Sequence, residues 1–147
     1  MLQLTIRTWA IYNKPNHNFF YMKNKLNILH LDDSEAIIAH EKKMLEPVTN
    51  IQPIETANTI LQAKEIVIRQ SIDAAIFGMN LPDGNGISLL KWIKQNHPAT
   101  SVIMFSNHAD SFFRDAAARA SAGHFLDKST EFEQIPKIIS ELHKQQL

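Results

Sequence analysis

Five short apolar runs alternate with five segments of helical periodicity along most of this 147-residue chain. The runs cover residues 26–31, 50–55, 74–77, 101–106 and 124–127, each the length of a buried strand. The segments between and after them space their apolar residues as the buried face of a helix does. Strands that alternate with helices predict right-handed crossovers and a parallel sheet covered on both faces. The sequence therefore predicts a doubly wound α/β domain with five strands.

Capping and stop residues delimit the predicted helices. Ser34 is suited to cap the first helix, which Pro47 ends. The second helix is expected over residues 58–70, the third from Ile87 until just before Pro98, and the fourth over 112–120. Ile135 begins the apolar pattern of the last helix. Between the third strand and the third helix, the run of proline and glycine in residues 82–86 predicts a turn.

Composition excludes several classes of protein. Basic and acidic residues number 15 each, so the chain lacks the net positive charge that general nucleic-acid or anionic-membrane binding needs. It has no cysteine, which excludes disulfides and thiolate metal sites, and no apolar run approaches the length of a membrane span. We therefore expect a cytoplasmic protein that binds neither nucleic acid nor membrane.

Residues 1–21 differ from the rest of the chain. They contain five aromatic residues and no acidic residue, whereas the regular pattern of strands and helices begins after Met22. Leu2, Leu4 and Ile6 alternate as in a strand, so this leader could dock on the domain or on a partner. The alternatives are a disordered tail or a start site assigned too far upstream. We therefore expect a leader over 1–21 and a domain over 22–147.

Polar residues follow the predicted strands at the edge where doubly wound sheets carry their functional sites. Asp32 and Asp33 follow the first strand, the segment 78–82 follows the third, Ser106 ends the fourth, and Lys128 follows the fifth. Adjacent carboxylates suit Mg²⁺, which prefers oxygen ligands. They equally suit a turn and a helix N-terminus. His30, inside the first apolar run, is expected to be a core histidine rather than a ligand.

The motifs LHLDDSE, DAAIFGMNLPDGNG, VIMFS and AGHFLDKS together resemble the receiver domain of two-component response regulators, also called CheY-like. The resemblance covers residues 22–147 and implies the flavodoxin-like strand order 2-1-3-4-5. It also implies a role for five residues. Asp32 and Asp33 correspond to the acidic pair that helps to hold Mg²⁺, Ser106 and Lys128 to the residues that contact the phosphoryl group, and Phe125 to an aromatic residue that reorients.

This sequence departs from the family at the nucleophile. Receiver domains accept a phosphoryl group on an aspartate four residues before the proline of the turn, and that position is Gly78. Asp73 and Asp83 lie too far along the chain to substitute for it, given the rise of a strand. Asn80 corresponds to the residue whose backbone carbonyl ligates the metal. We therefore expect no catalytic residue and no enzyme activity.

With one carboxylate fewer, a single ammonium group can offset much of the charge of the remaining pair. We expect Lys128 to pair with Asp33 or Asp32 and partly to replace the metal. No cofactor is expected, and Mg²⁺, with Asp32, Asp33 and the Asn80 carbonyl as ligands, would bind weakly at most. Phe125 is expected to serve packing first, because no phosphoryl signal drives its movement.

The leading interpretation is a stand-alone pseudo-receiver that acts in two-component phosphorelay signalling by protein contact. The resemblance implies a protein partner, such as a sensor histidine kinase or another signalling protein, or a second copy of this chain. The family's usual contact face would include Phe112, Phe113, Arg114 and Arg119. The alternative is a phosphorylatable single-domain regulator in which Gly78 replaces the acceptor aspartate through engineering or error. A nucleotide-binding domain is disfavoured because the sequence has no phosphate-binding loop.

Overall fold

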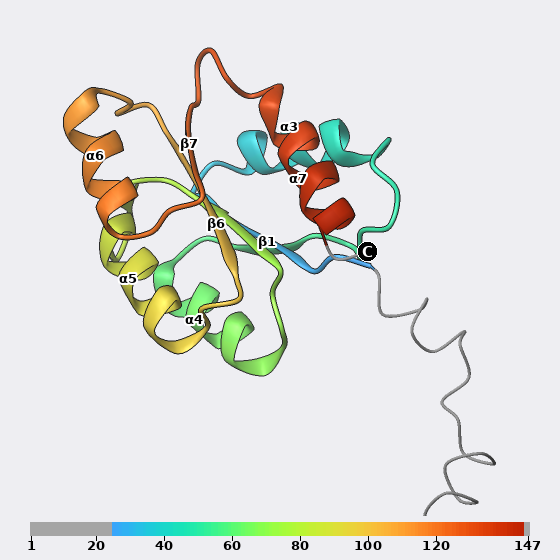
Figure 1. Ribbon diagram of the computed structural model, residues 1–147, viewed down its shortest axis with the longest axis horizontal. Coiled ribbons are helices and arrows are strands. Elements are labelled where there is room, and N and C mark those ends of the chain that lie inside the picture. The colour runs from blue at the N-terminus through green and yellow to red at the C-terminus, as the bar shows by residue number, and fades with distance from the viewer. Residues whose placement is uncertain (1–24, 146–147) are drawn as a thin grey trace, which may run out of the picture.

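A five-stranded parallel sheet forms the centre of the domain in the computed structural model, which describes residues 25–145 (Figure 1). The strand order β2-β1-β3-β6-β7 is the predicted order 2-1-3-4-5, because β4 and β5 form a separate hairpin. The strands of the sheet are β1 (Ile28–Leu31), β2 (Glu55–Ala57), β3 (Ala74–Phe77), β6 (Ser101–Ser106) and β7 (His124–Asp127). The flavodoxin-like fold class is therefore confirmed.

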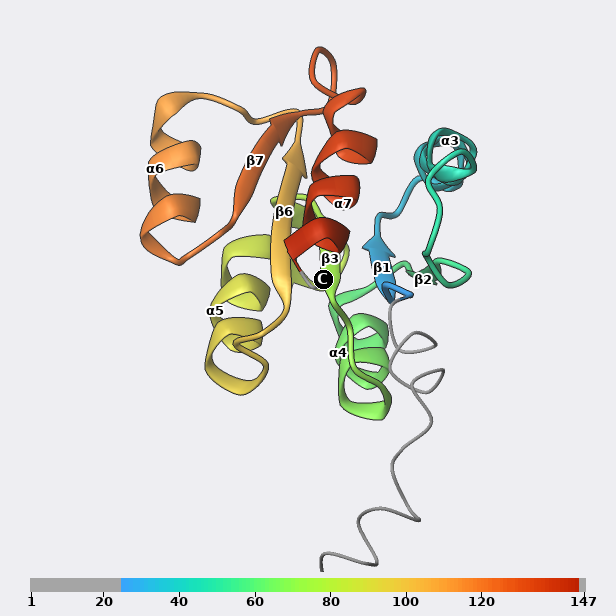
Figure 2. The same ribbon diagram turned by 45° about the vertical axis from the view of Figure 1, so that its right-hand side comes forward.

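Helices cover both faces of this sheet, as the views in Figures 1 and 2 show. α3 and α7 lie together on one face, and α4, α5 and α6 cover the other. The helices are α3 (Glu35–Leu45), α4 (Ile60–Arg69), α5 (Gly86–Asn96), α6 (Ser111–Arg119) and α7 (Gln134–Gln145). Ser34 caps α3 as expected, since its hydroxyl accepts a hydrogen bond from the Ile37 amide, and Pro136 lies in the first turn of α7.

Each face of the sheet has its own apolar core because alternate residues of a strand point to opposite faces. In β1, Leu29 and Leu31 pack with the α4, α5 and α6 side, whereas Ile28 packs with α3 and α7. All four residues of β1 and all four of β3 are buried, as expected for strands covered on both sides. The carboxyl ends of these central strands are thereby fixed relative to one another.

β2 is the one strand whose predicted position was wrong. The expected strand over residues 50–55 is replaced by Glu55–Ala57, and Ile51 makes only an isolated bridge with Leu26. Pro53 has no amide hydrogen to donate to the ladder, which accounts for the later start of regular pairing. The predicted leader, residues 1–21, lies outside the described residues. No helix within residues 25–145 is long and apolar enough to span a membrane.

A two-stranded hairpin follows β3 and fixes the backbone around Gly78. It consists of β4 (Asn80–Leu81) and β5 (Gly84–Asn85), and it places Gly86 against Gly78. A Cβ atom on Gly86 would overlap the Gly78 carbonyl oxygen, so glycine is needed there for this close approach. Asp83, at the turn of the hairpin, accepts hydrogen bonds from the Ile60 and Leu61 amides at 2.7 and 3.0 Å and so ties the hairpin to α4.

Candidate functional site

A cavity of about 170 Å³ lies at the carboxyl ends of the central strands. We call it the strand-end pocket. Of the residues that the sequence singled out, it brings Asp33, Gly78, Asn80, Ser106 and Lys128 together. Its other lining residues are Met79, Asn107 and His108. The segments that supply these side chains follow β1, β3, β6 and β7, as the alternation of strands and helices predicts.

Lys128 forms an ion pair with Asp32 inside this site. The Lys128 ammonium donates a hydrogen bond to Asp32 Oδ2 at 2.5 Å, and the two side chains are only 17% and 3% exposed. The second oxygen of Asp32 accepts a hydrogen bond from the Ser34 amide at 2.9 Å. Both carboxylate oxygens therefore have a protein partner. The expected lysine contact is present, and Asp32 is the partner.

Lys128 occupies one of the carboxylates that a divalent cation would need at this site. Asp33 is exposed and Asn80 lines the pocket, but the charge of Asp32 is offset by Lys128 and Gly78 has no side chain. Mg²⁺ takes about six oxygen ligands and favours at least one or two carboxylates. Within residues 25–145, no cluster of three or more His, Asp or Glu side chains could hold a metal ion. Of the Mg²⁺ ligands that the family resemblance implies, Asp33 and Asn80 line this pocket, whereas Asp32 is bound by Lys128.

Gly78 is buried at the end of β3 and faces Lys128. A Cβ atom built on Gly78 would lie 4.0 Å from the Lys128 ammonium and 3.1 Å from the backbone carbonyl oxygen of Phe105. A side chain at this position would thus point at the ammonium group, although the carbonyl would have to yield by a few tenths of an ångström. A side chain at position 78 would therefore be directed toward Lys128, but glycine has no side-chain atom that could contact Lys128 or accept a phosphoryl group.

The Ser106 side chain stabilises the backbone that follows it in the same pocket. Its hydroxyl oxygen accepts a hydrogen bond from the His108 amide at 3.1 Å, which shapes the turn that leads into α6. The Ser106 side chain is buried, whereas Asn107 and His108 are exposed at the mouth of the pocket. The hydroxyl is therefore available to the interior of the pocket only, and Asn107 and His108 border its opening.

The family model described as response regulator receiver domain matches residues 28–140 of this chain. The chain belongs to this family. The match includes every residue of the strand-end pocket, so the resemblance noted from the sequence motifs is confirmed.

The curated relatives that this chain matches are longer than the chain. The chain is 28% identical over 101 residues to the response regulator protein PilR of Pseudomonas aeruginosa, covering 67% of this chain and 23% of that protein. It is 25% identical over 109 residues to the Fimbriae Z protein of Salmonella typhimurium, covering 74% of this chain and 52% of the relative. The receiver domain thus spans between about a quarter and half of these relatives.

Solved structures agree with the fold. The signal receiver domain of a putative Luxo repressor protein from Vibrio parahaemolyticus matches with a TM-score of 0.76 at 23% identity, covering 83% of this chain and 92% of that one. A CheY-like receiver domain from Methanospirillum hungatei matches with a TM-score of 0.74 at 24% identity, covering 83% and 96%. At these identities the likeness shows the fold alone.

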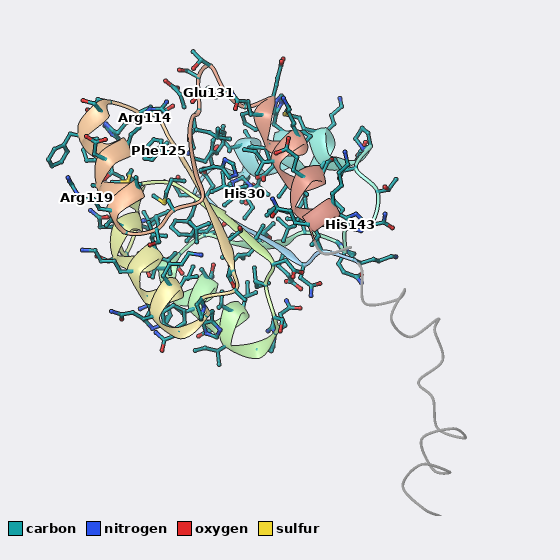
Figure 3. All side chains as sticks on the ribbon, in the orientation of Figure 1. His30, Arg114, Arg119, Phe125, Glu131 and His143 are labelled. Atoms are coloured by element: carbon teal, nitrogen blue, oxygen red, sulfur yellow. The ribbon has the colours of Figure 1, made fainter. Side chains whose placement is uncertain are left out.

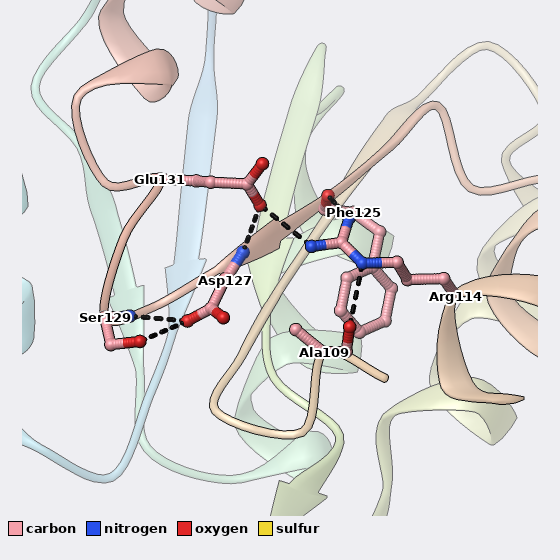
Figure 4. Close-up of polar contacts among 6 residues, drawn as sticks. All are labelled: Ala109, Arg114, Phe125, Asp127, Ser129 and Glu131. Carbon is pink, nitrogen blue, oxygen red and sulfur yellow. Dashed lines mark hydrogen bonds and ion pairs between the residues drawn. The ribbon is translucent and has the colours of Figure 1, made fainter. Parts of the chain in front are cut away.

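Phe125, the candidate switch residue, is held by Arg114 (Figure 4). The Arg114 guanidinium carbon lies 5.2 Å from the centre of the Phe125 ring, and Nη1 donates to the Phe125 carbonyl at 2.9 Å. Nη2 donates to Glu131 Oε2 at 3.0 Å, and Nε donates to the Ala109 carbonyl at 2.8 Å. Arg114 thus joins α6 and the segment before it to β7 and to the loop after β7, a role that the sequence analysis missed.

Glu131 completes this network on the β7 side. Its Oε2 also accepts a hydrogen bond from the Asp127 amide at 2.7 Å, and this bond together with Arg114 lowers the pKa of the Glu131 carboxyl. The Asp127 carboxylate in turn accepts hydrogen bonds from the Ser129 amide and hydroxyl, which lower its own pKa. The loop after Lys128 is therefore ordered by side chains of this receiver domain itself.

The expected contact face on α6 contains both exposed side chains and side chains that make contacts within the domain; Figure 3 labels two of them, Arg114 and Arg119. Phe112 is 69% exposed and Arg119 is exposed, while Phe113 is half-buried against the core. Arg114 is used internally by the Phe125 network. Phe112 and Arg119 are therefore the side chains of this set that α6 presents to solvent most fully.

His30 and Glu41 form a buried pair, of which the sequence predicted only the core position of His30. His30 of β1 lies in the core, as expected, but its Nδ1 contacts Oε2 of Glu41 on α3, and both side chains are almost wholly buried. Burial lowers the pKa of His30 to about 4. A glutamate on an amphipathic helix normally faces solvent, so no local signal distinguished Glu41 from its exposed neighbours.

Proposed function

We propose that this chain is a pseudo-receiver in two-component signalling, which acts through protein contact and is not phosphorylated at the usual position. The observation that carries the proposal is the arrangement at position 78. Gly78 stands where a side chain would point at the Lys128 ammonium, and that ammonium is paired with Asp32 instead. The domain would then act as an interaction module rather than as an enzyme.

The charge balance of the pocket supports this proposal. A receiver domain with three carboxylates at this site needs a cation to offset their mutual repulsion. Here Lys128 neutralises Asp32, and the exposed Asp33 is solvated. The Lys128 ammonium thus offsets the charge of Asp32 without a divalent cation.

The alternative function rests on the survival of the other pocket residues. Asp32, Asp33, Ser106 and Lys128 all remain at the ends of their strands, as a phosphorylatable regulator requires. Under this alternative, the native protein would carry aspartate at position 78. The partner would be a sensor histidine kinase or another signalling protein in either case, or a second copy of the chain.

Mass spectrometry of the intact protein tests whether the chain with Gly78 accepts a phosphoryl group at any residue. The purified chain is incubated with a small phosphodonor, such as acetyl phosphate, and Mg²⁺, and then weighed. We expect no phosphoryl adduct on the native chain and one adduct on Gly78→Asp. Gly78→Asn is the matched control, because it has the same size but no carboxylate nucleophile. A stoichiometric adduct on the native chain would refute the pseudo-receiver proposal.

A further inference from the structure

An apolar groove far from the strand-end pocket runs along the β2 side of the domain. Its volume is about 440 Å³, and it lies between the C-terminal end of α3 and the segment before β2. We call it the edge groove. Leu45 is buried at its floor, whereas Val48, Ile51 and Ile54 are half-buried and still partly exposed. The other lining residues are Lys42, Glu46, Gln52 and Pro53.

The chain enters the described fold beside this groove. The Leu26 amide donates a hydrogen bond to the Asn50 carbonyl at 2.8 Å, and the Gln52 amide donates to the Leu26 carbonyl at 2.9 Å. Leu26 therefore pairs with the segment that forms one wall of the edge groove. The residues that precede it along the chain start from that wall, whatever path they take.

The length of the preceding segment suffices to reach across the groove. Phe20 stands six residues before Leu26, and six residues span at most about 20 Å when extended. Phe19, Phe20 and Tyr21 are consecutive, so an aromatic cluster lies within this reach. Buried aromatic side chains remove large apolar areas from water, and the edge groove presents apolar walls that are incompletely covered.

Charge also favours this segment as the occupant. Residues 1–24 contain three basic residues and no acidic residue, which leaves 12 basic and 15 acidic residues in the rest of the chain. The leader and the domain therefore have opposite net charges. Opposite charges raise the encounter rate of the two and disfavour docking of one domain on another.

We propose that the leader of this chain docks on its own domain, with Phe19, Phe20 and Tyr21 covering the edge groove. The aromatic rings pack against Val48, Ile51 and Ile54, and the leader continues the pairing that Leu26 begins with the segment before β2. The proposal is independent of the phosphorylation state of the domain, since the edge groove and the strand-end pocket share no residue.

The absence of cysteine makes a direct test simple, because a single introduced cysteine carries a spin label at one known position. The full-length Asn16→Cys variant is labelled with ¹⁵N and with a nitroxide, and amide spectra are recorded with the label oxidised and reduced. We expect the Val48, Ile51 and Ile54 amide signals to lose intensity in the oxidised state. Lys91→Cys, on the exposed face of α5, is the matched label control and should leave these three signals unchanged.

Two further samples identify the occupant. The first sample mixes ¹⁵N chain that has no nitroxide with nitroxide-labelled chain that has no ¹⁵N. The amide signals of Val48, Ile51 and Ile54 should keep their intensity in this mixture, because the contact lies within one molecule. The labelled chain with Phe19, Phe20 and Tyr21 all changed to serine should also recover these signals. Unchanged intensity in the first experiment, loss of intensity in the mixture, or loss that persists in the serine variant would each overturn the proposal.

Discussion

Substitution of Lys128 by methionine should destabilise the protein strongly. The change keeps most of the side-chain volume but removes the ammonium group that pairs with Asp32, whose side chain is 3% exposed. Removal of one partner from a buried ion pair costs about 3–5 kcal/mol, because the other charge stays buried without compensation. Since Lys128 is itself 17% exposed, we expect the lower end of this range, about 3 kcal/mol. Urea unfolding followed by circular dichroism at pH 7 measures the loss directly.

Two controls distinguish loss of the ion pair from loss of a surface charge. Lys91→Met removes an exposed lysine of α5 and should change the free energy of unfolding by less than about 0.5 kcal/mol. Asp32→Asn in the Lys128→Met background removes the uncompensated charge and should recover much of the loss. A loss below about 1 kcal/mol for Lys128→Met would place Lys128 in the range of solvated surface pairs and refute this reasoning.

Three other contacts give predictions for the stability of the domain. Asp83→Asn should lower the melting temperature and speed hydrogen exchange in the first turn of α4, because the Asp83 carboxylate accepts two hydrogen bonds there; thermal unfolding and exchange measurements check this. Arg114→Lys should destabilise by about 1 kcal/mol in urea unfolding, since lysine cannot contact Phe125 and Glu131 together, and an effect equal to that of Arg119→Lys would contradict it. Burial lowers the pKa of His30 to about 4 from 6.5, so the folded state binds fewer protons and stability falls as the pH drops from 6.5 to 4, by up to about 3 kcal/mol. Urea unfolding across this pH range should show a smaller fall in the free energy of unfolding when His30 and Glu41 are both changed to leucine.

The sequence predicted three strands to the residue: the wholly buried β3, the largely buried β6 and the partly buried edge strand β7. The strands at residues 74–77, 101–106 and 124–127 begin and end where their apolar runs do. The position of β2 was predicted wrongly because only three of its residues pair and the expected run contains polar residues, so hydrophobicity alone did not fix it. Pro53 inside the expected run was the local signal against a strand there.

The candidate site was predictable to the extent that it follows strand ends. Asp32, Ser106 and Lys128 were found because parallel strands bring their carboxyl ends to one edge of the sheet. The sequence did not predict the contacts of Arg114 and Glu41, because the residues that each one contacts lie on other helices, strands or loops. The contacts of Arg114 with Phe125 and Glu131 span 11 and 17 residues of sequence, beyond the reach of helical periodicity.

Lys128 and Phe125, which the family resemblance singles out for signalling, contact different residues in this protein. At the pocket, the ammonium that would contact a phosphoryl group is paired with Asp32. At the α6 and β7 surface, the aromatic that would respond is fixed by Arg114, which is in turn bonded to Glu131. The two arrangements share no side chain, but both are built on β7 and the residues that follow it. If the pseudo-receiver proposal holds, the exposed Phe112 and Arg119 are the side chains of α6 that a partner would contact first.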